Sequence, residues 1–70
     1  MNAKISLETA YKKLSKKLSV DASRLTVVRT LRGERMAYEF LCSYNDTKYF
    51  VYLDAETGEE IAIINAQNVQ

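Results

Sequence analysis

Four acidic side chains lie close together near the end of the chain: Asp54, Glu56, Glu59 and Glu60. A group of carboxylates could hold a calcium ion, or could supply the acid and the base of a hydrolytic reaction. These four lack the dense spacing of carboxylate and carbonyl ligands that a calcium loop needs. They also fall at the tip of a predicted hairpin, which offers no cleft for a reacting group. The sequence therefore predicts neither a metal site nor a catalytic pair here.

The other candidate for chemistry is Cys42, the one cysteine of a chain that contains no histidine. A cysteine nucleophile needs a base beside it, and histidine is both the commonest base and the commonest metal ligand. Cys42 is expected on the core face of a strand, where a thiol packs as a small, inert hydrophobe. We therefore expect no catalytic residues and no cofactor.

The size of the chain, 70 residues, predicts one small domain over residues 1–70. Its formal net charge of +1 argues against nucleic acid as the partner, because neutralising phosphates requires an excess of lysine and arginine. No apolar run is long enough to cross a membrane. Membrane contact is therefore expected only through parts of the parent protein outside this chain.

Residues 7–19 have the spacing of an amphipathic helix, with Ser6 as its N-cap. The apolar stripe of this helix comprises Leu7, Ala10, Tyr11, Leu14 and Leu18. Lysines gather away from the stripe, where they most often form a solvated face. A sharper alternative is docking onto an anionic surface. The lysines concerned are Lys12, Lys13, Lys16 and Lys17.

From Arg24 onward, apolar and polar residues alternate and turn signals recur, which is typical of a four-stranded antiparallel meander. Two-residue loops are predicted at Gly33-Glu34 and at Asn45-Asp46, because Gly, Asn and Asp tolerate positive φ. The predicted fold class is α+β: one N-terminal amphipathic helix packed on one face of a four-stranded antiparallel sheet.

These loops predict which side chains share a face of the sheet. The second loop sets Phe40 opposite Val51, and the first loop sets Val27 opposite Phe40. Both assignments put the apolar side chains on the same face, which we expect the helix to cover. A single helix leaves the other face open, so its apolar residues form the candidate partner-binding surface. That surface comprises Leu41, Phe50 and Tyr52.

The third reversal, at residues 54–58, reads as a turn motif. Asp54 or Thr57 can hydrogen-bond the turn backbone, and Gly58 can adopt the positive φ needed to enter a further strand. That strand covers residues 61–64. Its register stays open, because a bulge at Gly58 would exchange which of Ile63 and Ile64 points inward.

Three segments of the sequence resemble the PepSY domain family in their expected order. Residues 5–10, "ISLETA", resemble its helix start, residues 38–40, "YEF", its "YeV" strand, and residues 49–59, "YFVYLDAETGE", its "vDa.tGev" element. The last of these is the most specific. The departures are Phe40, where valine is usual, and Glu60, where an apolar residue is usual.

The resemblance implies a non-catalytic module of the kind found in propeptides of thermolysin-like peptidases and in secreted or membrane-anchored bacterial proteins. Such domains are thought to bind and restrain peptidases or other cell-wall-associated partners. We therefore expect an extracytoplasmic binding or regulatory module whose partner is a peptidase or an adjacent domain of its parent protein. The alternative is a structural role: self-association into a homodimer through the open face or an edge strand.

Overall fold

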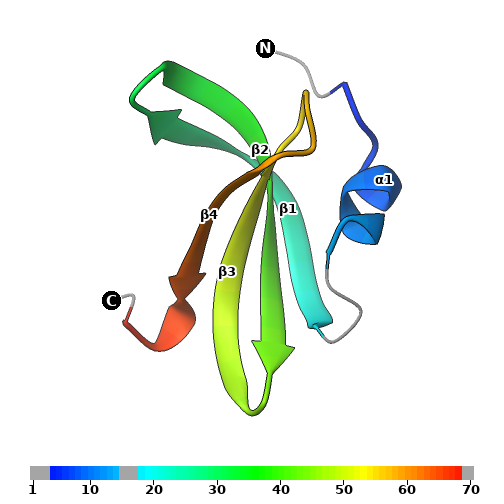
Figure 1. Cartoon of the computed structure of the whole chain (residues 1–70), viewed down its shortest axis with the longest axis vertical. Helices are drawn as coiled ribbons and strands as arrows, with labels where there is room; N and C mark the ends of the chain where they lie inside the picture. Colours follow the sequence, from blue (N-terminus) through cyan, green and yellow to red (C-terminus); the bar gives the residue numbers. More distant parts are fainter. Residues whose placement is uncertain (1–3, 15–17, 69–70) are drawn as a thin grey trace.

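The computed structural model describes residues 4–14 and 18–68, which form one short helix and one four-stranded antiparallel sheet (Figure 1). The strands are ordered β1-β2-β3-β4, as a meander requires. The α+β class and the four antiparallel strands predicted from the sequence are therefore confirmed. The elements are α1 (Leu7–Lys12), β1 (Ser19–Thr30), β2 (Gly33–Tyr44), β3 (Thr47–Asp54), β4 (Glu60–Asn65) and the 3₁₀ helix η1 (Ala66–Asn68).

Helix α1 begins as predicted and ends earlier than predicted. The Ser6 side chain accepts a hydrogen bond from the Thr9 backbone N–H at 3.1 Å, which makes Ser6 the N-cap. The expected continuation to residue 19 is wrong. Lys13 and Leu14 donate their N–H groups to carbonyls three residues back, which tightens and closes the last turn. Strand β1 already starts at Ser19, because this part of the chain pairs with the far end of β2.

The β1–β2 register differs from the predicted one by four residues. Thr30 is paired with Gly33, so the loop is Leu31-Arg32 and Gly33 opens β2 with φ of 101°. The Thr30 hydroxyl accepts from the Arg32 N–H at 3.1 Å and donates to the Gly33 carbonyl at 2.8 Å, which holds this loop. Phe40 consequently lies opposite Ser23 rather than Val27. Because the shift is even, every side chain keeps its predicted face.

The β2–β3 register is confirmed: Asn45 and Asp46 form the loop with φ of 48° and 63°, and Phe40 lies opposite Val51. The structure also settles β4. Its irregularity falls at Ile61 rather than at Gly58. Ile63 thus lies opposite Val51 on the helix side, and Ile64 opposite Phe50 on the open side.

The buried cluster combines β2 and β3 with the helix and the turn after β3. In α1, Ala10 is fully buried, and the Tyr11 ring meets the Phe40 ring edge-on at 6.4 Å between centroids. Leu25 and Val27 of β1 face the helix side but are 45% and 50% exposed, because α1 is too short to cover all four strands. The cluster consists of Ala10, Tyr38, Phe40, Cys42, Val51, Leu53 and Ala55.

Candidate functional site

A polar row crosses the centre of the open face, built by one residue from each of three neighbouring strands. Register places Arg24 of β1 opposite Glu39 of β2, and Glu39 opposite Tyr52 of β3. The Arg24 guanidinium donates to both Glu39 carboxylate oxygens, at 2.7 and 3.4 Å. The Tyr52 hydroxyl donates to the same carboxylate at 2.6 Å. We call this set the polar row.

The polar row shifts the pKa of each of its members. Burial and the hydrogen bond to Glu39 raise the pKa of Tyr52 to about 12. Burial alone would favour the protonated form of Glu39, but the hydrogen bonds from Tyr52 and Arg24 outweigh it and lower the pKa of this carboxyl. The hydrogen bond to Glu39 raises the pKa of Arg24. Near neutral pH the row therefore holds a carboxylate, a guanidinium and a neutral phenol.

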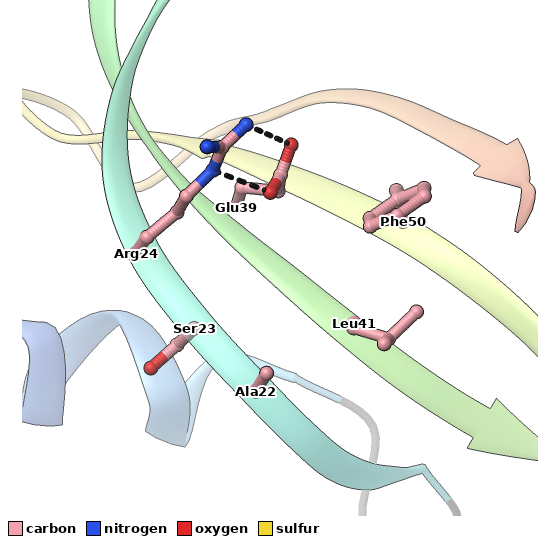
Figure 2. Close-up of a pocket in the computed structure, with 6 residues that line it drawn as sticks. All are labelled: Ala22, Ser23, Arg24, Glu39, Leu41 and Phe50. Carbon is pink, nitrogen blue, oxygen red and sulfur yellow. Dashed lines mark hydrogen bonds and ion pairs between the residues drawn. The ribbon is translucent and has the colours of Figure 1, made fainter.

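An apolar row lies beside the polar row, two residues away along each strand. Register aligns Ala22, Leu41, Phe50 and Ile64 across all four strands. A shallow hollow of about 130 Å³ lies over its β1–β3 part, and Figure 2 shows Leu41 and Phe50 on neighbouring strands, to one side of the Arg24–Glu39 pair. Leu41 and Phe50 are half-buried, and Ile64 is 41% exposed.

A second polar set borders the apolar row on its other side. Asp21, at the bulge in β1, accepts hydrogen bonds from the Ser43 hydroxyl at 2.7 Å and from the Lys48 ammonium at 2.9 Å. These two hydrogen bonds lower the pKa of Asp21. On the open face, the apolar row therefore lies between the Arg24–Glu39 ion pair and the Asp21–Lys48 ion pair.

The structure brings together the three side chains that the sequence suggested for partner binding. Leu41 and Phe50 belong to the apolar row, whereas Tyr52 belongs to the polar row and is half-buried with its hydroxyl already bonded. Sequence reasoning missed Ile64, because the register of β4 was open. It also missed the Arg24–Glu39 pair, because the predicted β1 register placed other residues opposite each other.

The turn after β3 is held by its own side chains. Asp54 is buried, and its carboxylate accepts from the N–H groups of Glu56 at 2.7 Å and Thr57 at 3.3 Å. The Thr57 hydroxyl accepts from the Glu59 N–H at 3.1 Å, and Gly58 has φ of 79°. Arg35 donates to the second Asp54 oxygen at 3.2 Å. These contacts stabilise the turn and leave Asp54 no free oxygen for a ligand.

Of the four lysines that the sequence suggested for anionic-surface binding, the structure describes Lys12 and Lys13. Lys12 pairs with Glu8 at 3.5 Å along the helix, and the Lys13 side chain lies over Gly58. Lys16 and Lys17 lie within residues 15–17, which fall outside the described ranges.

Cys42 is fully buried, and desolvation by this burial raises the pKa of its thiol. A buried thiol of this kind is a poor nucleophile. Among residues 4–14 and 18–68, no three or more cysteine, aspartate or glutamate side chains come together in a way that could hold a metal ion. No helix within the described part is long and apolar enough to cross a membrane.

Comparison with known proteins gives two matches. The model of the PepSY family, described as "Peptidase propeptide and YPEB domain", matches residues 4–64. The solved C-terminal domain of YpeB from Bacillus megaterium superposes with a TM-score of 0.89 at 32% sequence identity over 97% of this chain. This chain spans 30% of that solved chain. A comparison with curated protein sequences gives no match.

Proposed function

The chain belongs to the PepSY family, and from this premise we propose that it is a binding module that recognises a protein partner through the open face of its sheet. PepSY domains are typically non-catalytic propeptide or regulatory modules in extracytoplasmic or secreted proteins. We infer the same setting for this chain. Its partner is then a peptidase, which it restrains, or an adjacent domain of the parent protein.

The observation that carries the proposal is the apolar row and its polar borders. A partner can bury Leu41, Phe50 and Ile64 without stranding a charge, because the charged groups on both sides are already paired within the face. The charged groups beside the apolar row also favour one orientation of the partner. Polar groups of the partner can contact Arg24 and Glu39 on one side of the row and Lys48 on the other.

The size of the apolar row favours a weak or tethered contact. Covering about 300 Å² of apolar surface would contribute on the order of 7 kcal/mol at ~25 cal/mol per Å². Association and side-chain ordering cost a comparable amount. A domain joined to this one in the same protein avoids much of that cost through a high effective concentration. The likeness to one part of a longer solved chain supports such a tethered partner.

The test is to label this domain with ¹⁵N and to titrate it with the remaining domains of its parent protein or with a peptidase encoded beside it. We expect amide shifts to concentrate on the open face of β2, β3 and β4. Phe50→Ala and Ile64→Ala should weaken binding about tenfold or more, because both remove apolar contact area. If the partner is a peptidase, adding the domain should also slow its hydrolysis of substrate.

The matched control is Ile63→Ala, which trims a side chain that is 53% exposed on the opposite face of the sheet. This variant should bind like the unmodified domain. Binding that survives both open-face variants, or amide shifts confined to the helix side, would assign recognition to another surface.

A further inference from the structure

Strand β1 is an edge strand with a long regular stretch. It pairs with β2 on one side, and no strand of the described chain pairs with its other side. The bulge at Asp21 and the loop at Leu31 bound this stretch, which therefore covers residues 22–30. It contains no proline and no lysine, and its two charged residues, Arg24 and Arg29, are paired with Glu39 and Glu34 of β2. Its backbone can therefore accept another strand.

Apolar side chains are exposed beside this edge. Leu25 and Val27 project from β1 toward the helix side, and their exposed fractions are 45% and 50%. Leu7 and Tyr11 lie one turn apart on α1, with exposed fractions of 43% and 52%. Figure 1 shows α1 beside β1, at the same side of the molecule. An incoming strand at this edge would cover Leu25 and Val27 first.

We propose that β1 pairs antiparallel with β1 of a second copy of this chain, about a twofold axis at Thr26. The midpoint of residues 22–30 is Thr26, so this register uses the whole regular stretch. It sets Leu25 opposite Val27 of the second copy, and the reverse, which completes two apolar cross-strand pairs. The bulge and the loop thus fix the same register that the apolar side chains favour.

Charge placement also fits this register. Arg24 falls opposite Val28 of the second copy, and Arg29 falls opposite Ser23, so no like charges meet. A register two residues further along would set Leu25 opposite Arg29. A register shifted two residues toward the N-terminus would set Val27 opposite Ser23 and bring the Asp21 bulge into the pairing. Registers shifted by one residue would place the paired apolar side chains on opposite faces.

The self-complementarity of this stretch is the reason to choose a second copy over another protein. In an isologous interface each residue must suit its own symmetry mate, and Thr26 on the axis does so, because threonine pairs stabilise neighbouring strands. The contact is small compared with standard interfaces, so we expect a dimer that dissociates at micromolar concentrations. This inference is independent of the proposed role of the open face.

The first test is the molar mass in solution. Sedimentation of the unmodified domain should show a monomer–dimer equilibrium over the micromolar to millimolar range. Val27→Lys should weaken dimerisation about tenfold or more, because it removes both apolar pairs at once. The control Ile63→Lys changes a residue that is 53% exposed on the same face at the other edge of the sheet, and should dimerise normally.

The second test fixes the register by cross-linking. Opposite residues of an antiparallel pair have Cβ atoms about 4.5–5.5 Å apart, close to the span of a disulfide. Under mild oxidation Thr26→Cys should form a covalent dimer at least ~10-fold faster than Val28→Cys, whose symmetry mates lie several residues apart. The unmodified chain, with its buried Cys42, serves as the blank. A strict monomer at millimolar concentration would overturn the proposal, as would equal cross-linking by the two variants. A monomer that captures an extended segment of another protein would assign the edge to a different occupant.

Discussion

Two arginine–carboxylate pairs of this sheet, Arg35–Asp54 and Arg24–Glu39, differ in what the carboxylate binds. The Asp54 side chain is 6% exposed, and it bonds two turn N–H groups as well as Arg35. The Glu39 side chain is 14% exposed, and it bonds only side chains, those of Arg24 and Tyr52. The first pair holds the backbone together. The second pair lies on the open face, which we propose as the partner-binding surface.

The two carboxylates differ in which groups would lose a hydrogen-bond partner if the carboxylate were removed. Removing Asp54 would take away the acceptor of two turn N–H groups and of the Arg35 guanidinium at once, and the loss of several hydrogen bonds to one buried carboxylate is costly. Removing Glu39 would free a phenol and a guanidinium that can both reach water. The same type of ion pair therefore holds the backbone of a turn in one place and links only side chains of neighbouring strands in the other.

The largest expected effect comes from Asp54→Ala. It removes the acceptor for the Glu56 and Thr57 N–H groups and the partner of Arg35, so we expect the free energy of unfolding to fall by about 3 kcal/mol. Urea denaturation followed by circular dichroism measures this change. Asp54→Asn keeps an acceptor oxygen for the turn and should cost less. The comparison breaks if Glu39→Ala destabilises the domain as much as Asp54→Ala does.

An intermediate effect is expected for Gly58→Ala, in the same turn. With φ of 79°, an alanine is strained there, and its Cβ would approach the Lys13 Cε to 2.6 Å. We expect a loss of about 1–2 kcal/mol in thermal or urea unfolding. Combining it with Lys13→Ala separates the two causes, because that change relieves the contact and leaves the backbone strain. Full rescue by Lys13→Ala would show that backbone strain contributes nothing.

The smallest effect on stability concerns the polar row, and it appears as a pH dependence. Because the pKa of Tyr52 is raised to about 12 from 10.0, its contribution to stability is present below pH 10 and is lost as pH rises toward 12. Glu39→Gln should bring this pKa back toward 10, since it removes the charged acceptor. Ultraviolet titration of tyrosinate measures the shift, with Tyr52→Phe identifying the signal among the five tyrosines. An unchanged titration curve in Glu39→Gln would show that the hydrogen bond does not set the pKa.

The β2–β3 register was predictable because the residue types of its loop indicate the position of the turn. Asn45 and Asp46 both adopt positive φ, and few other residue pairs do so readily. The β1–β2 loop was misplaced, because Gly33 suggested a position inside the loop, whereas Thr30 fixes the loop two residues earlier with its hydroxyl. Since the register shift was even, the predicted face of each side chain was correct, whereas the predicted β1–β2 cross-strand pairs were wrong.

The candidate site was predictable in outline only. Alternation along β2 and β3 identified Leu41, Phe50 and Tyr52 as neighbours on one face. The Arg24–Glu39 contact and the place of Ile64 depend on the pairing of distant strands and on the irregularity at Ile61, which no local pattern encodes. The length of α1 was overestimated, because its apolar periodicity continues past Lys12, whereas the helix closes at Lys13 and pairing of β1 begins at Ser19.

The turn after β3 also links the N-terminal segment to β2. The Ala55 carbonyl accepts the N–H groups of both Lys4 and Ile5 at 2.9 Å, and the Ala55 N–H donates to the Met36 carbonyl at 3.0 Å. During synthesis on the ribosome, the first residues of the domain emerge long before Ala55 does. Their hydrogen bonds to Ala55 can form only after the turn following β3 has left the exit tunnel, so this domain should complete its folding late in translation rather than growing from its start.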